Sequence, residues 1–427
     1  MRILYLVHQF APEFVGGTEI DTWEVAHRMQ ARGHRVAIVH RAPGRRGVVH
    51  TNREGIPVIR LEFGPTTRRA LFAATFGHPA LARAVDSVSR EFHPDLLHVQ
   101  HLRGLPPTIV ASHQVGGCPV VISLRDYWFA CSNAELLDDV TGRVCTHPGE
   151  AVHCARCAMV RSGARGLLPI ALGLAPILGL RNRILKGVLR HADGLLVYSE
   201  FVRQWFARYG VGNAPLHLVR RGIPRPRTMP DRSDGDMAHV VRLGYIGGLA
   251  WEKGVHVVLE AVSNLPETVE LVVAGDDTKH PDYVAYLKSL VHHPGIRFVG
   301  RLNRDGVWSL LARLDAVVVP SLWFETFSMV THEALAMGVP AIVSGHGVLA
   351  DVIEHGVNGL CVPPGDVDAW RGAISEFVRS PSLRQRLQYG IKPPPDMDEY
   401  VNGVQAVYEE VLSRGRSGVN GPGTRVC

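Results

Sequence analysis

The sequence lacks any run of about 18 consecutive apolar residues, the length that a helix needs to cross a bilayer. It also lacks the features of a signal peptide, because its first apolar run ends at His8 and no small-residue cleavage site follows. We interpret that run, Ile3–Val7, as a buried first strand. We therefore expect a cytoplasmic protein.

Long blocks of Lys or Arg are absent as well, although the chain is basic, with a formal net charge of +6. Without such blocks, or basic residues interleaved with aromatic ones, nucleic acid is not expected as a partner. The positive balance favours an anionic substrate or an anionic membrane surface, and it does not distinguish the two.

Cysteine is scarce, with seven residues in 427, and this odd count does not indicate a set of disulfide bonds. Four of the seven fall in a loop-like region rich in Asp, Gly and His, and the last two form a C-x2-C pair. Four thiolates with such a pair are typical of a tetrahedral structural zinc site. The ligands would be Cys131, Cys145, Cys154 and Cys157, with His147 or His153 as a substitute for one of them. The alternatives are unligated reduced thiols or a redox pair.

The chain does contain a regular alternation of short apolar runs and helical patterns, which is typical of parallel sheets covered by helices. The strands predicted in the first half are Ile3–Val7, Val36–Val39, Leu96–Val99, Val120–Ser123, Leu195–Tyr198 and Leu216–Val219. Those predicted in the second half are Val241–Ile246, Leu271–Ala274, Ile296–Val299, Ala316–Val319 and Ala341–Val343. The predicted helices are Thr18–Arg32, Val255–Leu265, Tyr283–His292, Asp305–Leu314, Met329–Met337 and Tyr400–Leu412.

A stretch rich in Pro, Gly and charge interrupts this alternation and indicates a linker between two domains. The expected fold is therefore α/β, with two facing Rossmann-like domains, parallel sheets, and a cleft at the carboxyl ends of the strands. The predicted segments are a first domain at 1–222 with a cysteine-rich insertion at about 126–160, a linker at 223–239, a second domain at 240–395, a helix that crosses back at 396–413, and a disordered tail at 414–427.

The most informative segment runs from Val319 to Ala341 and has the pattern of a strand, a loop and a helix. Thr326 or Ser328 is placed to cap this helix, and the N–H groups of its first turn would bind phosphate. Glu325 precedes the helix and Glu333 lies more than a turn inside it, so acidic groups flank the anion site. A nucleoside diphosphate sugar has hydroxyls on both sides of its pyrophosphate and suits this pattern. The alternative is a pair of solvated helix carboxylates.

The Glu-x7-Glu spacing of Glu325 and Glu333, with Glu-Ala-Leu-Ala-Met-Gly-Val-Pro from Glu333 onward, resembles a large family of retaining glycosyltransferases. This family has the GT-B fold and includes glycogen synthase-like and mannosyltransferase-like group 1 enzymes. Three further segments resemble it in the right order: Phe10–Glu19 with Arg32–Val36, Gly247–Gly254, and Leu349–Gly359. The similarity covers nearly the whole chain.

The resemblance implies a role for each matching residue. Glu333 would hold the ribose hydroxyls, Glu325 the hydroxyls of the donor sugar, and Lys253 the pyrophosphate. The other donor-binding residues would be Gly16, Gly17, Thr326, Phe327, Ser328, Met329 and Val330. Because fixed cations and helix N-termini stabilise a departing diphosphate, no metal is required for catalysis. The acidic triplet at 234–236 lies in the predicted linker and is not interpreted as a metal site.

Two positions depart from the family pattern. Gly248 stands where the family usually has an arginine that binds phosphate, so we expect another cation to compensate, either Arg125 or one of Arg220 and Arg221. Where the family commonly has a second histidine near the donor sugar, this chain has Gln100 followed by His101. Either residue could contact the sugar; we favour His101 as the catalytic residue, and the alternative is a core histidine whose hydrogen bonds are satisfied.

The segment 166–180 is apolar but contains two prolines, and four basic residues follow it. These residues are Arg181, Arg183, Lys186 and Arg190. Such a segment fits peripheral contact with the inner face of a membrane, with the basic residues on anionic lipid. The alternative is a buried helix pair that covers the first sheet.

These observations together predict a retaining hexosyltransferase. It would bind a nucleotide-sugar donor on 240–395 and act on an acceptor held by 1–222, which is a glycan, a lipid-linked molecule or a small molecule of polysaccharide or cell-envelope biosynthesis. One alternative is a UDP-sugar 2-epimerase, which shares the architecture. Another is a nucleotide-sugar-binding protein without turnover, which Gly248 motivates.

Overall fold

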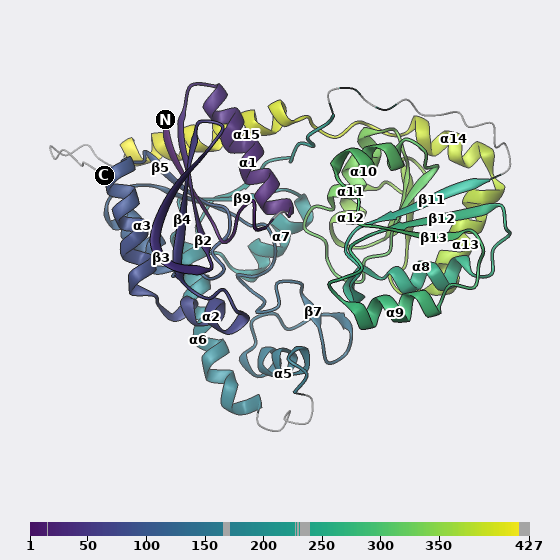
Figure 1. The fold of residues 1–427 in the computed structure, drawn as a ribbon, viewed down its shortest axis with the longest axis horizontal. Coiled ribbons are helices and arrows are strands. Elements are labelled where there is room, and N and C mark those ends of the chain that lie inside the picture. The colour runs from purple at the N-terminus through teal and green to yellow at the C-terminus, as the bar shows by residue number, and fades with distance from the viewer. Residues whose placement is uncertain (15, 165–170, 227, 229, 231–239, 418–427) are drawn as a thin grey trace. The chain divides into compact units, whose positions relative to one another are not determined.

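The computed structural model describes residues 1–427 except for 15, 165–170, 227, 229, 231–239 and 418–427. The chain divides into two compact units (Figure 1). Unit 1 comprises Met1–Thr141, Cys145–Gly222 and Met397–Cys427, and unit 2 comprises Gly142–Val144 and Ile223–Asp396. The predicted linker at 223–239 falls at the start of unit 2, and most of it lies outside the described residues.

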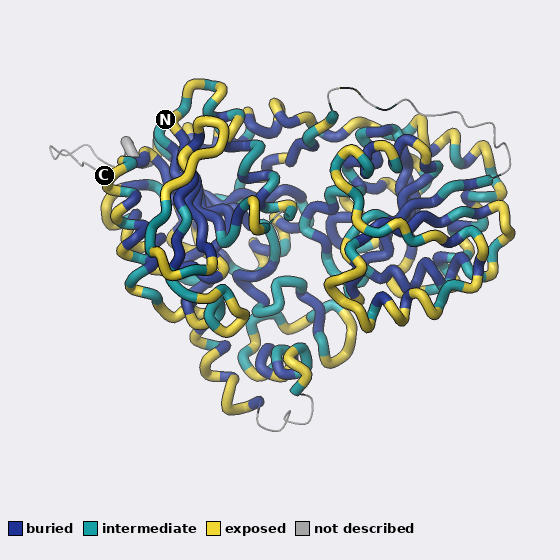
Figure 2. The backbone as a smooth tube through the Cα atoms, viewed as in Figure 1, coloured by how far each residue is buried: buried dark blue, intermediate teal, exposed yellow. Residues whose placement is uncertain are grey.

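Unit 1 is built on a sheet of eight strands in the order β10-β9-β6-β5-β1-β2-β4-β3. The strands are β1 (Arg2–Val7), β2 (Arg35–Ala42), β3 (Gly44–Arg53), β4 (Ile56–Gly64), β5 (Leu96–Val99), β6 (Val120–Ser123), β9 (Gly194–Val197) and β10 (Leu216–Leu218). All neighbours are parallel except β3 and β4. Strands β5, β6 and β9 are buried along their whole length, which explains their continuous apolar sequence (Figure 2).

The β3–β4 hairpin is absent from the sequence-based prediction. Strand β3 is largely exposed and polar, so it shows no apolar run. Its turn is made by Glu54 and Gly55, both of which have positive φ (49° and 84°). Two successive residues with positive φ match the right-handed twist of a two-residue hairpin.

The helices of unit 1 pack on this sheet and on one another. They are α1 (Gly17–Ala31), α2 (Arg68–Ala73), α3 (Pro79–Phe92), α4 (Thr108–Val115), α5 (Ala151–Arg161), α6 (Ala171–His191), α7 (Glu200–Tyr209) and α15 (Met397–Ser417). The cysteine-rich region contains α5 and the two short strands β7 (Leu137–Asp138) and β8 (Arg143–Val144). Helix α5 lies against α6 (Figure 1). No helix among the described residues is long and apolar enough to cross a membrane.

The last helix, α15, returns to unit 1 and closes a buried ion network. Asp21 of α1 is 2% exposed and is paired with Arg125 and Arg221. The Arg221 Nε donates to Asp21 Oδ1 at 2.7 Å, and the hydroxyl of Tyr400 on α15 donates to Asp21 Oδ2 at 3.0 Å. Asp21 therefore ties together α1, the ends of β6 and β10, and α15.

Helix α15 is longer than predicted. It continues to Ser417, so the prediction of a disordered tail from Arg414 is wrong for residues 414–417. An i,i+4 pair between Arg414 and Glu410 accounts for part of this extension, with Nη2 and Oε1 2.5 Å apart. Residues 418–427 of the predicted tail lie outside the described part of the chain.

Unit 2 contains a six-stranded parallel sheet in the order β13-β12-β11-β14-β15-β16. The strands are β11 (Val241–Ile246), β12 (Val269–Ala274), β13 (Ile296–Gly300), β14 (Ala316–Val319), β15 (Ala341–Ser344) and β16 (Gly359–Val362). The helices are α8 (Val255–Val262), α9 (Pro281–Ser289), α10 (Arg304–Leu311), α11 (Met329–Ala336), α12 (Gly347–Val352), α13 (Val367–Arg379) and α14 (Pro381–Tyr389). Strand β16 was not predicted; it opens with Gly359, a residue type depleted in strands.

We expect Asp21→Ala to destabilise the protein strongly, because it leaves two guanidinium groups without their counter-charge. Breaking a buried ion pair from one side costs about 3–5 kcal/mol. The measurement is the free energy of unfolding in urea. Tyr400→Phe is the matched control, since it removes one hydrogen bond to the same carboxylate and should cost about 0.5–1.5 kcal/mol. Equal costs for the two variants would contradict this account.

The same network predicts how stability depends on pH. Burial alone would raise the pKa of Asp21, but Arg125 and Arg221 hold it below its usual value. The stability that this carboxylate contributes is therefore complete above its unfolded pKa of about 3.9 and is lost as the pH falls through the lower folded pKa. Asp21→Asn should lose less stability than the natural chain between pH 5 and pH 2. A steeper loss in the variant would refute the assignment.

Candidate active site

Lys253 and Glu325 form an ion pair at the carboxyl edge of the sheet in unit 2. Lys253 lies in the turn that follows β11, and Glu325 lies in the loop that follows β14. These two strands are neighbours in the sheet, so their carboxyl ends lie side by side. The Lys253 Nζ donates to Glu325 Oε1 at 2.8 Å. The structure thus brings together two residues that the sequence separates by 72 positions.

Glu325 is a buried carboxylate that the loop holds in its charged form. Its Oε1 also accepts hydrogen bonds from Ser321 Oγ at 2.8 Å and from Trp323 Nε1 at 3.2 Å. Burial alone would raise the pKa of Glu325, but Lys253 and these hydrogen bonds lower it. The Lys253 ammonium lies 4.8 Å from the Trp323 ring centroid, within range of a cation–π contact. Sequence reasoning missed Ser321 and Trp323, which hold Glu325 in place.

Gly254 allows the lysine turn to approach the glutamate loop. It has a φ of +68°, and a Cβ at this position would lie 2.0 Å from the carbonyl oxygen of Pro320. Only glycine tolerates both the left-handed conformation and this close backbone approach. The Glu-Lys-Gly sequence therefore has a structural reason: Gly254 sets the distance from which Lys253 reaches Glu325.

Helix α11 begins at Ser328, which has an unusual backbone conformation. Ser328 has φ 60° and ψ 80°, and its side chain makes no capping hydrogen bond to the helix. Of the two predicted caps, Thr326 and Ser328, the structure places Ser328 at the N-cap, but its hydroxyl contacts Thr331 Oγ1 at 2.8 Å instead of the helix backbone. A non-glycine residue in this region costs of order 1–3 kcal/mol, and such strain clusters at functional sites.

The other predicted donor residues surround this helix start. Thr326 and Phe327 lie in the loop before it, and Met329 and Val330 form its first turn. The Phe327 ring stacks on His332 at 4.0 Å, which fixes the loop against the helix. The structure thus groups the residues expected to surround a pyrophosphate.

Glu333 lies inside α11, is buried, and is paired with Arg304. Arg304 is the first residue of α10, directly after the N-cap Asn303, and its side chain is 39% exposed. Arg304 was not identified from the sequence. The signal that could have found it is its position: it is a basic residue directly after a helix N-cap, in the segment that follows a predicted strand. Because the Arg304 side chain is partly exposed, this arrangement suits a Glu333 carboxylate that exchanges Arg304 for the hydroxyls of a ligand.

Gly16 and Gly17 begin α1 in unit 1. Gly16 is the N-cap in extended backbone, and a Cβ there would lie 2.7 Å from Glu19 Oε2. The carbonyl of Gly17 accepts a hydrogen bond from Arg221 Nη2 at 3.0 Å. The glycine at position 16 is thus explained by its own surroundings, because a side chain there would come too close to the buried side chain of Glu19.

His101 lies directly after β5 and has partners at both ring nitrogens. The Arg103 backbone N–H donates to Nδ1 at 3.0 Å, so Nε2 carries the proton and donates to Asp126 Oδ2 at 3.1 Å. The rings of His8 and Trp128 lie at centroid distances of 4.4 and 5.5 Å. Burial, His101 and Arg103 hold the pKa of His8 well below its usual range, so His8 is neutral.

Arg125 and Arg221, two of the candidates to replace the arginine missing at position 248, both lie in unit 1 and share one carboxylate, Asp21. Arg125 also donates to Gln100 Oε1, with Nε at 3.1 Å, and this places Gln100 in the same buried network. The two side chains are only 4% and 9% exposed, whereas Arg220 is exposed. Compensation by one of these cations stays a prediction.

The four cysteines of the predicted zinc site form no disulfide bond among the described residues. Within the described part of the chain, no group of three or more His, Cys, Asp or Glu side chains is arranged to hold a metal ion. The Cys157 Sγ lies 3.3 Å from both Asn133 Nδ2 and Asp139 Oδ2. Burial raises the pKa of Cys145 to about 11, so this thiol is protonated. A zinc site at Cys131, Cys145, Cys154 and Cys157 stays a prediction from sequence spacing.

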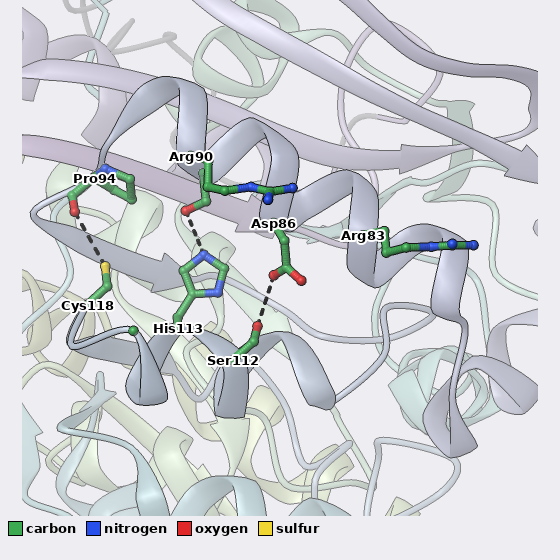
Figure 3. Close-up of a pocket in the computed structure, with 9 residues that line it drawn as sticks. Arg83, Asp86, Arg90, Pro94, Ser112, His113 and Cys118 are labelled. Carbon is green, nitrogen blue, oxygen red and sulfur yellow. Dashed lines mark hydrogen bonds between the residues drawn. The ribbon is translucent and has the colours of Figure 1, made fainter. Parts of the chain in front are cut away.

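A separate pocket of about 320 Å³ lies between α3 and α4 (Figure 3). In this pocket Ser112 Oγ donates to Asp86 Oδ1 at 3.0 Å, and His113 Nε2 lies 2.8 Å from Ser89 Oγ. Pro94 and Cys118, which also line it, precede β5 and β6, so the pocket lies at the amino ends of these strands. Ligands in such folds bind at the opposite, carboxyl edge. We therefore assign this pocket no part in the site.

Comparison with family models gives two matches. Residues 15–226 match the model described as Glycosyltransferase Family 4, and residues 241–392 match the model described as Glycosyl transferases group 1. The two matches do not overlap and together include Lys253, Glu325, Glu333 and His101.

Two relatives align along most of the chain. Glycogen synthase of Mycobacterium tuberculosis is 25% identical over 413 residues, which are 90% of this chain and 88% of the relative. A GDP-mannose-dependent alpha-mannosyltransferase of Corynebacterium glutamicum is 26% identical over 396 residues, covering 91% of this chain and 83% of the relative.

Solved structures resemble the whole fold. Sucrose-phosphate synthase from Thermosynechococcus elongatus gives a TM-score of 0.72 at 16% identity, over 97% of this chain and 100% of that chain. HepE of Anabaena, solved in complex with UDP, gives 0.67 at 17% identity, over 96% and 100%. These similarities confirm the predicted α/β fold of two Rossmann-like units.

We expect Gly254→Ala to disrupt the Lys253–Glu325 pair, because the new Cβ collides with the Pro320 carbonyl and φ is unfavourable. The variant should unfold at a lower temperature than the natural chain, as measured by differential scanning calorimetry. Gly248→Ala, in the same loop, is the control, since a Cβ at Gly248 has no atom within 4 Å. If both alanines left the melting temperature unchanged, the close approach would play no part in building the site.

Proposed function

The chain belongs to the glycosyltransferases, with a family 4 segment in unit 1 and a group 1 segment in unit 2, and we propose that it is a retaining hexosyltransferase with a nucleoside diphosphate sugar as donor. Its fold is the GT-B fold. The observation that carries the proposal is the Lys253–Glu325 pair beside the start of α11, with Glu333 further along the same helix.

The proposed donor site lies on unit 2. Lys253 supplies a positive charge for the pyrophosphate, and the first turn of α11 adds backbone N–H groups and the positive end of the helix dipole. Glu325 takes the hydroxyls of the donor sugar, and Glu333 takes those of the ribose in exchange for its contact with Arg304. HepE was solved with UDP and with UDP-glucose, which supports a nucleotide-sugar donor for a chain of the same fold.

The reaction we propose breaks the bond between the sugar C1 and the β-phosphate oxygen, and forms a bond from C1 to the acceptor oxygen on the same face. The acceptor hydroxyl gives its proton to the departing phosphate oxygen, so the products are the glycoside and the nucleoside diphosphate. Negative charge grows on the diphosphate as the first bond breaks. A fixed cation already in place stabilises that charge without reorganisation.

In this scheme the acceptor is held by unit 1, near His101. The Asp126–His101 pair sets the ring orientation and places the proton on Nε2. His101 therefore offers an oriented imidazole at the carboxyl edge of the sheet in unit 1, and we propose that it positions the reacting sugar.

Lys253→Ala and Glu333→Ala should each lower kcat by about 100- to 1000-fold, the loss typical when one group that stabilises the transition state is removed. The assay follows release of nucleoside diphosphate from donors identified by thermal shift with UDP-, GDP- and ADP-sugars. Glu267→Ala, which changes an exposed glutamate before β12, is the control and should retain full activity. Unchanged activity in both site variants would overturn the proposal, and donor isomers formed without an acceptor would indicate a 2-epimerase instead.

Gly248→Arg should bind nucleoside diphosphate more tightly than the natural chain. Position 248 is exposed and has open space around its Cβ position, so a guanidinium fits there. A charge-assisted hydrogen bond contributes about 1.5–3 kcal/mol, which corresponds to roughly 10- to 100-fold in Kd. Isothermal titration with UDP, GDP and ADP measures the change. Gly248→Gln is the uncharged control, and equal gains in both variants would show that a cation at this position has no special role.

A further inference from the structure

A pocket of about 460 Å³ in unit 1 is not used by the donor scheme. It lies between α2, α5, α6 and the loop that follows β6. Its lining combines three arginines, Arg68, Arg103 and Arg161, with an apolar wall that includes Phe72, Ile177 and Leu178. A pocket with separate basic and apolar walls suits a ligand that has both kinds of surface.

The basic wall carries positive charge that is not paired with a carboxylate among the described residues. Arg161 is neutralised by Glu135 and by Asp139, whose Oδ2 lies 3.0 Å from the Arg161 Nε. Arg68 and Arg103 are exposed, and neither side chain has a hydrogen-bond or ion-pair partner within the described residues. Two unpaired guanidinium groups on one pocket favour a phosphate, which they bind through parallel N–H···O bonds.

The apolar wall continues out of the pocket along α6. Leu174 and Ile177 line it and are 42% and 44% exposed, and Leu172 and Leu180 on the same helix are 65% and 49% exposed. Large apolar side chains exposed together mark a surface that binds an apolar partner. The basic residues predicted to bind lipid differ in exposure. Arg183 and Arg190 are exposed, whereas Arg181 is buried and donates to the Trp128 carbonyl.

The pocket also adjoins the proposed acceptor side of the active site. Trp128 lines the pocket, and its ring lies 5.5 Å from that of His101. Arg103, two residues after His101, donates its backbone N–H to the His101 ring. The pocket and His101 therefore share Trp128 and Arg103 as neighbours.

We propose that this pocket binds the acceptor and that the acceptor is an anionic lipid-linked molecule, with a phosphate-bearing headgroup and a hydrocarbon chain. This inference rests on the proposed transferase function and names the class of its second substrate. The phosphate lies between Arg68 and Arg103, and the chain follows Leu174 and Ile177 along α6. The headgroup carries the hydroxyl to be glycosylated and extends past Trp128 toward His101.

The test compares three probes that separate the two walls: dodecyl phosphate below its micelle concentration, inorganic phosphate, and dodecyl maltoside. Binding is followed by isothermal titration. Dodecyl phosphate should bind at least tenfold more tightly than either of the others. Arg68→Ala/Arg103→Ala should remove the advantage over dodecyl maltoside, and Leu174→Ser/Ile177→Ser the advantage over inorganic phosphate. Equal binding of the three probes by the natural chain would overturn the proposal.

Matched controls lie outside the pocket lining and its apolar continuation. Val115→Ser changes an exposed apolar residue of α4, and Arg183→Ala changes an exposed basic residue of α6; both variants should bind dodecyl phosphate as the natural chain does. If they weaken binding as much as the pocket variants do, the amphiphile binds the protein surface and the pocket assignment is wrong.

A second measurement keeps this inference separate from the proposed function. UDP, GDP and ADP are tested by thermal shift on the same variants, which leave Lys253, Glu325 and Glu333 intact. If one nucleotide stabilises the protein and dodecyl phosphate does not bind, the acceptor inference fails and the transferase proposal stands. If dodecyl phosphate binds and no nucleotide does, the transferase proposal fails, and the acceptor inference fails with it.

Discussion

The pairing of Lys253 with Glu325 is the interaction on which the site in unit 2 depends. A buried carboxylate is costly unless a cation and hydrogen-bond donors compensate its charge, and here Lys253, Ser321 and Trp323 all converge on one oxygen of Glu325. The pair forms because β11 and β14 are neighbours and because Gly254 lets the lysine turn contact the Pro320 carbonyl. The ion pair therefore fixes the Lys253 ammonium at the carboxyl edge of the sheet, where the proposed donor site requires a cation.

Unit 1 uses buried charge for a different purpose. Asp21 binds Arg125 and Arg221 and receives a hydrogen bond from Tyr400, so a single carboxylate joins α1, two strand ends and the C-terminal helix. Arg125 and Arg221 therefore stabilise the fold of unit 1. The contrast with Lys253 is one of exposure, since the Lys253 side chain is 26% exposed and that of Arg125 only 4%. The partly exposed ammonium of Lys253 is accessible to a ligand, whereas the buried guanidinium of Arg125 is not.

The sequence was sufficient to predict the fold, because short and mostly apolar segments such as β5, β6, β11 and β14 alternate with helical patterns, as buried parallel strands do. Their order placed the donor residues at one sheet edge. The sequence could not predict which side chains pair with each other. From the sequence, the positive charge of Arg125 looks free to bind a phosphate, and only the structure shows that Asp21 pairs with it. Arg304 was missed for the same reason, because its partner Glu333 comes 29 positions later.

Gly248 and Arg304 together change how charge is supplied to the proposed donor site. Gly248 leaves Lys253 without the neighbouring guanidinium that the family pattern predicts, while Arg304 provides a guanidinium on the far side of α11, held by Glu333. If Glu333 turns to the ribose, it loosens its hold on Arg304, and the positive charge of Arg304 then has no compensating carboxylate nearby. Under the proposed function, donor binding would thus create a second cation at Arg304. Charge would then be supplied by exchange of partners, which a residue-by-residue comparison of motifs does not reveal.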